Sequence, residues 1–352
     1  MTTFKAYAYI STMNLHEEIA QEITLNGAMP FSRFMELALY HPSLGFYASG
    51  GVGRRKDFIT SPEAGPLFGK LVANALDKWW KELGNPDPFY FIEAGAGPGT
   101  LARSVLKAQP DCQRALRYIA VEKSALQRSQ HPEGVQSSDQ LPDKNISGVI
   151  FANELLDNLP FDIYENEQAG EWSQVCVGSS NGLFHEVLIK ADEGLNGVFG
   201  IAQSSGTRIP YQTMARRWLS DALGLIESGR IVVIDYALPS FPAAANHKWL
   251  RTYRGHGPGE SPLVEPGSQD ITTDVDLNQI SSVRTPDSIQ FQHEWLQSLG
   301  ISDLVEEGKR VWLENASNPN VEALAARSRA TEAEALLDPN GLGGFTVIEW
   351  KI

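Results

Sequence analysis

The sequence predicts an α/β fold built on a mostly parallel, doubly wound sheet. Short apolar runs typical of buried strands alternate with helical patterns, which indicates a parallel sheet covered by helices. Four runs end in a polar or acidic residue, and they cover residues 89–93, 118–122, 149–153 and 231–235. Because ligands of open α/β sheets bind outside the carboxyl ends of the strands, we expect these polar ends to converge on one crevice. Residues 345–350 are expected to form a final strand.

Composition favours a folded protein and excludes several functional classes. Of the 352 residues, 42% are hydrophobic, which is enough apolar material for a sizeable core. The formal net charge of −14 argues against a nucleic-acid partner, because phosphates are bound mainly by clustered basic residues. Only two cysteines are present, Cys112 and Cys176, so we expect neither a disulfide framework nor a metal site.

The sequence predicts a cytoplasmic protein that does not insert into membranes. No uninterrupted apolar run approaches the roughly 20 residues needed to cross a bilayer. The first 22 residues contain Glu17, Glu18 and Glu22 but only one basic residue, Lys5. That pattern matches neither a secretory signal nor an Arg-rich transit peptide.

The domain organisation predicted from the sequence has two parts. Residues 1–85 form a helical N-terminal section, because apolar side chains recur at helical spacing over residues 31–39 and again over residues 67–80. This section is expected to pack on a core formed by residues 86–352.

Two insertions interrupt the predicted core, around residues 161–190 and 239–285. The first shows the alternation of antiparallel strands, with Asn181 and Gly182 as a hairpin turn. Within the second, the segment from Pro239 to Asp276 is rich in glycine, proline and polar residues and shows no period. A stretch this long without secondary structure is usually a lid or a binding loop, so we expect it beside the crevice.

The strongest local motif is a glycine loop that follows the first core strand and precedes a helical run. It reads Glu-Ala-Gly-Ala-Gly-Pro-Gly-Thr and contains Gly95, Gly97 and Gly99. Glycine lets the backbone turn sharply and approach a ligand closely. A dinucleotide site requires G-x-G-x-x-G, and here Thr100 occupies the third glycine position. The spacing instead resembles the E-x-G-x-G-x-G of Rossmann-like S-adenosylmethionine methyltransferases.

Two carboxylates fit this cofactor. Glu93 ends the first core strand and suits a cationic ligand. Glu122 ends the next strand, where its two oxygens can accept hydrogen bonds from two ribose hydroxyls. Since NAD enzymes place an acid equivalently, Glu122 indicates a nucleoside without deciding which one. The alternative interpretation is a strand-turn-helix corner without a ligand.

Three further residues are candidates for cofactor binding. Asn153, at the end of its strand, is expected to contact the amino-acid portion of the cofactor. Asp139, after a short strand near Val135, is placed to accept from the adenine amino group, although a plain surface turn also explains it. Ser61 precedes a predicted helix, so helix capping is an alternative to ligand contact.

Five motifs in register resemble one known family over nearly the whole chain. They begin at Tyr40 (YHPSLGFY), Asp57 (DFITSPE), the glycine loop, Asn153 (NELLDNLP) and Tyr253 (YRGH, followed by PGSQDIT). Together they are similar to the MidA-like methyltransferases, the family of the mitochondrial complex I assembly factor that methylates a protein arginine. The resemblance implies a Rossmann-like methyltransferase core, S-adenosylmethionine as methyl donor and a protein arginine as acceptor. It further implies that the acceptor protein is a subunit of a respiratory complex I type enzyme.

The sequence departs from the family pattern at two motifs. The glycine loop commonly reads E-L-G-P-G-x-G, so the proline is shifted here. The segment N-E-F-F-D-A-L-P is replaced by a version in which Leu155, Leu156 and Asn158 stand for its aromatic pair and alanine. The second change bears on the acceptor side.

Candidate catalytic residues follow if the acceptor is arginine. A carboxylate that pairs with two guanidinium nitrogens holds the group and concentrates its positive charge away from the attacking nitrogen. Glu154 and Asp157 are the candidates for this clamp, because they follow a strand at the crevice. Their alternative role is that of acids near a helix N-terminus. Glu63, in the T-S-P-E turn, faces either the acceptor or its own helix.

Two rival functions remain open at this point. A non-catalytic assembly module could keep the cofactor site and transfer nothing, and a methyltransferase could act on small molecules. An NAD-dependent oxidoreductase ranks last, because the third glycine of the dinucleotide motif is missing.

Overall fold

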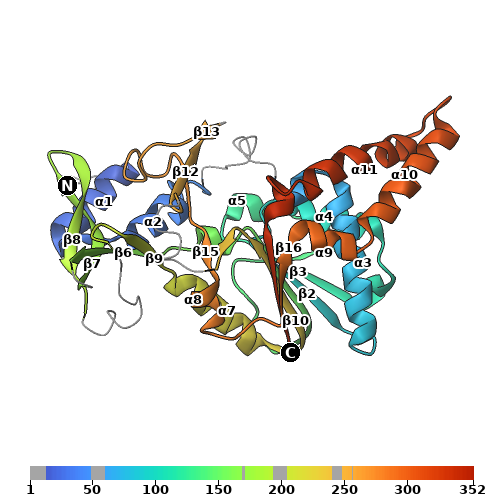
Figure 1. The fold of residues 1–352 in the computed structure, drawn as a ribbon, viewed down its shortest axis with the longest axis horizontal. Helices are drawn as coiled ribbons and strands as arrows, with labels where there is room; N and C mark the ends of the chain where they lie inside the picture. Colours follow the sequence, from blue (N-terminus) through green and yellow to red (C-terminus); the bar gives the residue numbers. More distant parts are fainter. Residues whose placement is uncertain (1–12, 49–59, 169–170, 193–203, 240–247, 256) are drawn as a thin grey trace, which may run out of the picture.

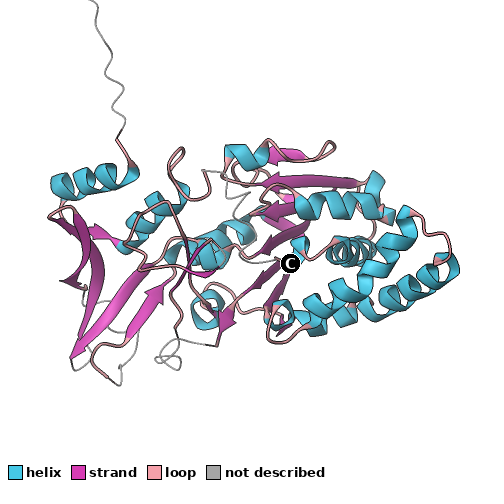
Figure 2. Cartoon of the chain, turned by 90° about the horizontal axis from the view of Figure 1, so that it is seen from above, coloured by secondary structure: helices cyan, strands magenta, loops and turns pink. Residues whose placement is uncertain are grey.

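The computed structural model describes residues 13–48, 60–168, 171–192, 204–239, 248–255 and 257–352. Two large sheets dominate it, a central seven-stranded sheet and a five-stranded antiparallel sheet. In Figure 1 the antiparallel sheet and the N-terminal helices lie at one end of the molecule, and a pair of long C-terminal helices lies at the other. Figure 2 shows the same elongated arrangement from above.

The central sheet confirms the predicted fold class. Its order is β16-β17-β10-β5-β2-β3-β4, and the five strands from β10 to β4 are parallel while β17 runs antiparallel to both β10 and β16. The strands are β2 (Phe89–Ala94), β3 (Leu116–Val121), β4 (Gln136–Ser138), β5 (Ile146–Asn153), β10 (Ile226–Asp235), β16 (Ser288–Phe291) and β17 (Thr346–Lys351). All four predicted core strands and the predicted final strand are therefore present.

Alternate residues of the central strands pack on opposite faces of the sheet. Phe91 and Phe151 belong to the core of one face, and Ile92 and Ile150 belong to the core of the other. Because both faces are buried, the strands appear in the sequence as continuous apolar runs. The helices that contribute to the two cores are α3 (Pro66–Glu82), α4 (Thr100–Ala108), α9 (Gln292–Ser298), α10 (Ile301–Asn315) and α11 (Val321–Leu337) on the first face, and α7 (Thr213–Leu225) and α8 (Leu277–Ser281) on the second.

The antiparallel sheet confirms the strands expected around residues 161–190. Its members are β1 (Met29–Pro30), β6 (Asp162–Gln168), β7 (Glu171–Ser180), β8 (Leu183–Lys190) and β9 (Arg208–Tyr211). Asn181 and Gly182 both have positive φ, 51° and 72°, and form the predicted two-residue turn between β7 and β8. Helices α1 (Leu15–Asn26) and α2 (Phe31–Tyr40) share an apolar core with this sheet.

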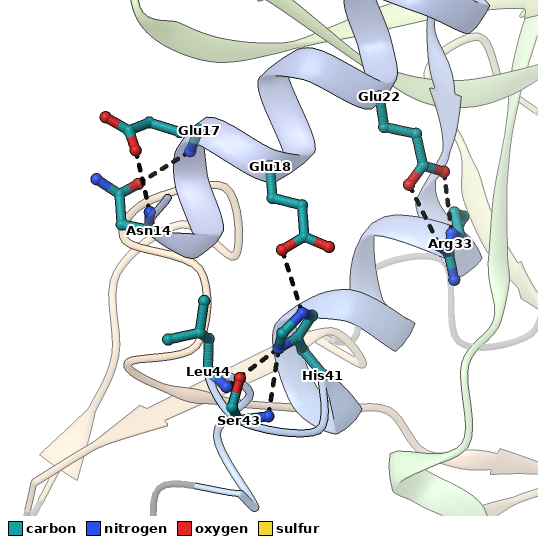
Figure 3. Close-up of polar contacts among 8 residues, drawn as sticks. All are labelled: Asn14, Glu17, Glu18, Glu22, Arg33, His41, Ser43 and Leu44. Atoms are coloured by element: carbon teal, nitrogen blue, oxygen red, sulfur yellow. Dashed lines mark hydrogen bonds and ion pairs between the residues drawn. The ribbon is translucent and has the colours of Figure 1, made fainter. Parts of the chain in front are cut away.

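Polar contacts join α1, α2 and the turn that follows α2 (Figure 3). Asn14 caps α1 by accepting a hydrogen bond from the Glu17 N–H, with an N–O distance of 2.9 Å. Glu18 contacts Nε2 of His41 at 3.2 Å, while Nδ1 of the same ring accepts from the Leu44 N–H at 3.1 Å. The turn after α2 is thereby held against α1.

The expectation of no secondary structure over residues 239–276 is wrong for the described part of that segment. It contains short strands, which pair into a three-stranded sheet and, with β11 (Ala237–Leu238), into a two-stranded one. Strands of two to four residues are too short to show a hydrophobic period, which explains why the sequence does not reveal them. They are β12 (Arg251–Arg254), β13 (Gly257–Pro258), β14 (Asp270–Thr272) and β15 (Val275–Asp276).

The helices of residues 1–85 divide between the two large sheets. Helices α1 and α2 pack with the antiparallel sheet, whereas α3 packs against the central sheet. The division of the chain at residue 85 into a helical section and a core stays a prediction.

Candidate active site

One large cavity lies at the carboxyl ends of the central parallel strands. Its volume is about 1280 Å³, beyond the roughly 300–1,000 Å³ of common small-ligand pockets, so it has room for a cofactor and an acceptor group. Of the four polar strand ends predicted to converge, three line this cavity, Glu93, Glu122 and Asn153, whereas Asp235 does not. Acidic side chains dominate its charged lining: Glu36, Glu63, Glu93, Glu122, Asp139, Glu154, Asp157, Asp221 and Asp270.

The glycine loop forms one wall of this cavity. Gly95, Gly97 and Gly99 have φ values of 71°, 55° and 79°, which favour glycine over residues with a side chain. Gly95 and Gly97 line the cavity. Gly99 is the residue before α4, and a Cβ atom there would lie 3.0 Å from Cδ of Pro132. Its part is therefore to shape the loop rather than to line the cavity.

Glu122 ties the glycine loop to the neighbouring strand. Its Oε2 accepts a hydrogen bond from the Gly97 N–H at 3.0 Å, and its Oε1 accepts from the Ser124 N–H at 2.8 Å. Each carboxylate oxygen retains acceptor capacity for a further donor, so the side chain still suits a ribose diol. Asp139 lies beyond the end of β4, is exposed and lines the same cavity.

Glu93 lies in the wall of the cavity at the end of β2. The hydroxyl of Tyr118 donates to its Oε2 at 2.6 Å. Burial raises the pKa of Glu93 to about 8, while the Tyr118 hydrogen bond acts in the opposite direction. A positively charged ligand nearby would favour the ionised form of this carboxyl group.

Asn153 offers an acceptor that the protein leaves unused. Its Nδ2 donates to Oε1 of Glu154 at 2.9 Å. Its Oδ1 is buried and accepts no hydrogen bond within the described residues. A buried acceptor without a donor is unfavourable, so this atom fits a ligand that brings an N–H, such as the ammonium group of S-adenosylmethionine.

Glu154 begins a tight turn directly after β5. Its φ is 52°, an uncommon value for a residue with a side chain. Burial, followed by the negative charge of Asp157, raises the pKa of Glu154 to about 8. Hydrogen bonds from the Asn153 side chain and the Ser61 backbone N–H act against this rise.

Asp157 presents one satisfied and one unsatisfied oxygen. Thr272 Oγ1 donates to its Oδ2 at 2.6 Å. Its Oδ1 is buried without a hydrogen-bond partner among the described residues. Burial raises the pKa of Asp157 to about 6, with the Thr272 hydrogen bond and the positive charge of Arg251 acting in the opposite direction. Like Oδ1 of Asn153, this oxygen is a buried acceptor that a donor group of a ligand can satisfy.

Asp235 is a site residue that the sequence analysis does not single out. It is fully buried, and its Oδ2 accepts hydrogen bonds from the N–H groups of Leu156 and Asp157 at 2.8 and 3.3 Å. Its Oδ1 accepts from the Tyr236 N–H at 2.9 Å. The carboxylate therefore holds the turn that carries Glu154 and Asp157. Its only signal in the sequence is its place at the end of an apolar run.

The T-S-P-E turn contributes unequally to the site. Glu63 lines the cavity, and its negative charge adds to the raised pKa of Glu154. Its Oε2 also accepts from the Thr60 N–H at 3.5 Å, in a capping box. Ser61 is fully buried, and its hydroxyl donates to Oε1 of Gln292 at 3.0 Å. Because that hydrogen bond directs the Ser61 hydroxyl to another partner, it is the backbone of Ser61 that reaches the site.

Four tyrosines line the cavity without having been predicted as site residues. They are Tyr40, Tyr47, Tyr236 and Tyr253. They come from the end of α2, the turn after it, the end of β10 and β12. Only the folded chain brings these segments together, although three of the four lie within or next to sequence motifs that were noted for the family resemblance.

Two features are absent from the described part of the chain. No group of three or more His, Cys, Asp or Glu side chains within that part has the arrangement of a metal centre. Within the same residues, no helix is both long enough and apolar enough to span a lipid bilayer.

The fold and the cavity define a Rossmann-like methyltransferase that uses S-adenosylmethionine. Residues 71–293 match the Methyltransf_28 family, described as "Putative S-adenosyl-L-methionine-dependent methyltransferase". The chain belongs to this family, and the predicted MidA-like resemblance is confirmed.

Solved structures and curated relatives agree with this assignment. A "COG1565 superfamily member" from Burkholderia thailandensis, crystallised "bound to S-adenosyl-homocysteine", is 25% identical, with a TM-score of 0.82 over 96% of this chain and 92% of that one. The "Protein arginine methyltransferase NDUFAF7 homolog, mitochondrial" of Drosophila melanogaster is 27% identical over 77% of this chain and 70% of its own. The human NDUFAF7 protein is 22% identical over 85% and 75%. S-adenosylmethionine is thus the cofactor.

Blocking the glycine loop tests where this cofactor binds. We expect Gly97→Val to weaken S-adenosylmethionine binding by at least about tenfold, because a branched side chain at a positive φ both strains the loop and enters the cavity. Titration calorimetry measures the affinity. Gly134→Val is the matched control, since Gly134 also has a positive φ, 84°, but no atom lies within 4 Å of a Cβ placed there. Equal affinity for S-adenosylmethionine in both variants would contradict the assignment of the cofactor to this loop.

The raised pKa of Glu154 predicts how stability depends on pH. Its ordinary pKa is 4.5, and in the folded protein it is about 8, so between these values the folded state holds a proton that the unfolded state releases. The contribution of Glu154 to stability is therefore present below about pH 4.5 and is lost as the pH rises toward 8. Between pH 5 and pH 8, the melting temperature should fall less for Glu154→Gln than for wild type. An unchanged drop would contradict the burial of this carboxyl group.

Proposed function

We propose that the protein methylates an arginine side chain of a partner protein. The observation that supports this most directly is the Glu154–Asp157 turn, which carries two carboxyl groups into the cavity, one of them with a buried oxygen that lacks a donor. A guanidinium group brings five N–H donors and a positive charge. It can therefore donate to the buried oxygen and also offset the negative charge of the carboxylates.

The acidic lining supports a cationic acceptor over a neutral one. The clamp residues and Asp270 all have raised pKa values, to about 8, 6 and 7. Burial is the first cause for each, and the negative charge of Asp157 adds to the rise at Glu154 and Asp270. A guanidinium between these groups would stabilise their ionised forms, because an opposite charge a few ångströms away offsets part of the free-energy cost of burying a charged carboxylate.

The two clamp residues suit different tasks. S-adenosylmethionine supplies an electrophilic methyl group on a positively charged sulfur. Asp157, with the lower pKa, is ionised at neutral pH, and its Oδ1 can accept from the guanidinium nitrogens that do not react. Glu154 holds a proton while the cavity is empty, since its pKa is about 8. A guanidinium beside it would favour the ionised carboxylate, which can then take the proton that the attacking nitrogen loses. The chain's own contribution is thus alignment, charge and a proton acceptor.

Fixed supports hold the clamp in place. Asp235 accepts hydrogen bonds from the backbone of the turn, and Thr272 on β14 donates one to Asp157. Arg251 is paired with Asp274 at 2.8 Å. Its positive charge near Asp157 lowers the pKa of that carboxyl group and so opposes the rise that burial causes.

The relatives supply the remaining support for this proposal. NDUFAF7 proteins of several animals carry the name "Protein arginine methyltransferase" and are 22–27% identical to this chain. The family resemblance adds a partner of the respiratory complex I type, which we propose as the first class of substrate to examine. A cavity of about 1280 Å³ favours a side chain presented by a protein over a closed pocket for a small molecule.

A label-transfer experiment tests the proposal. Protein extract from cells that lack the gene is incubated with S-adenosylmethionine carrying a labelled methyl group, and the protein hydrolysate is searched for methylarginine. We expect labelled methylarginine with wild type, and at least about a hundredfold less with Glu154→Gln or Asp157→Asn, because each removes a group that acts on the transferring nitrogen.

The controls separate the rival functions. Glu133→Gln, an exposed acid that does not line the cavity, should behave as wild type. Calorimetry must show that both clamp variants still bind S-adenosylmethionine. Label confined to small molecules would support the small-molecule enzyme, and no label in any fraction would support the non-catalytic module.

A further inference from the structure

An aromatic cluster with a carboxylate occupies a part of the cavity wall that the clamp does not use. Tyr40, Phe46, Tyr47 and Asp270 all line the cavity. The rings of Tyr40 and Tyr47 stack with centroids 5.4 Å apart, and Phe46 meets Tyr47 edge-on at 5.2 Å. We call these four residues the aromatic–acid cluster.

The carboxylate of the cluster is fixed through one oxygen. Oδ1 of Asp270 accepts from the Tyr47 hydroxyl at 3.0 Å, from Nδ2 of Asn158 at 3.1 Å and from the Ile271 N–H at 3.0 Å. Among the described residues its Oδ2 accepts no hydrogen bond. The three donors to Oδ1 fix the orientation of the carboxylate. Because Asp270 lines the cavity, Oδ2 is left as an acceptor for a ligand.

No basic side chain of the described residues neutralises this carboxylate. Its charged neighbour is another acid, Asp157, which together with burial raises the pKa of Asp270 to about 7. The two basic residues of β12, Arg251 and Arg254, pair with Asp274 and Glu265 instead. An unneutralised carboxylate among aromatic rings is the environment that proteins use to bind a soft cation, because ring faces and carboxylate both attract positive charge.

Contacts connect the cluster to both halves of the reaction. On one side, Ser124 donates its hydroxyl to the Tyr47 carbonyl oxygen at 3.0 Å and its N–H to Glu122, the predicted ribose ligand. On the other side, Asp270 and Thr272 are two residues apart on β14, and Thr272 donates to Asp157 of the clamp. Residues two apart on a strand share a face. The cluster therefore adjoins both the cofactor side and the acceptor side.

We propose that Tyr40, Phe46, Tyr47 and Asp270 form a second cation-binding site in the cavity, distinct from the Glu154–Asp157 clamp. Two positive groups of one chemistry can occupy it: the sulfonium of the cofactor, or a basic side chain of the protein substrate next to the methylated arginine. The first source depends only on the cofactor. The second rests on the proposed function.

Binding measurements on Asp270→Asn test the site and separate the two sources. Calorimetry compares S-adenosylmethionine with S-adenosylhomocysteine, whose sulfur is neutral. If the sulfonium occupies the site, the variant loses about tenfold in affinity for the charged compound and stays within about twofold for the neutral one.

The second arm uses fluorescence anisotropy with labelled peptides that contain one arginine flanked either by lysines or by glutamines. If a substrate side chain occupies the site, Asp270→Asn weakens the lysine-flanked peptide about tenfold and leaves the glutamine-flanked peptide and both cofactor forms unchanged. Since this arm measures binding alone, it does not depend on methyl transfer. A failure of the arginine-transfer experiment would therefore be distinguishable from a failure here.

Two further variants control for charge and packing. Glu133→Gln removes an exposed acid outside the cavity lining and should change neither comparison. Tyr47→Phe keeps the ring and removes only the hydroxyl that holds Asp270, so its effect should be roughly two- to threefold. Thermal melts verify folding of each variant.

Two results would overturn the proposal. The first is that Asp270→Asn, while still folded, leaves both cofactor forms and both peptides bound as in wild type. The second is that it weakens charged and neutral ligands equally, which would give Asp270 a structural role.

Discussion

The central physical constraint in this structure is the gathering of several carboxyl groups in one cavity with few basic partners. Burial raises the pKa of Glu93, Glu154 and Asp270 well above their ordinary values, so the protein holds protons there that free carboxyl groups would release. Such a lining is costly to ionise until cations enter it. A sulfonium cofactor and a guanidinium acceptor are both cations. The cavity favours both for the same reason, because each is attracted by the negative charge of the ionised carboxylates.

Different segments of the chain contribute the two walls of this cavity. The central sheet supplies the glycine loop, Glu122 and the turn after β5. These lie at the carboxyl ends of the parallel strands, where ligands of open α/β sheets generally bind. The other wall comes from the turn after α2, held by the antiparallel end of the molecule, and from β14 in the second insertion. Because the cofactor wall and the acceptor wall belong to different segments, substrate specificity can change without loss of the cofactor site.

Local patterns explain how much of this could be predicted. The core strands and the glycine loop follow from apolar runs and glycine spacing, and the turn at Asn181 follows from two residues. Asp235 could not be assigned, because its task is to bind backbone N–H groups of another strand's turn. Tyr47 and Asp270 lie 223 positions apart, and only tertiary structure shows that they form a hydrogen bond. The sequence leaves Ser61 open between cofactor contact and helix capping, and only the fold shows that its hydroxyl donates to Gln292.

The most direct test of this account is a crystal structure of the protein with S-adenosylhomocysteine and an arginine peptide. The account predicts the adenosyl group beside Glu122 and the glycine loop, with the guanidinium against Asp157 and Glu154. A nucleoside bound outside this cavity, or a guanidinium that contacts neither carboxylate, would contradict it.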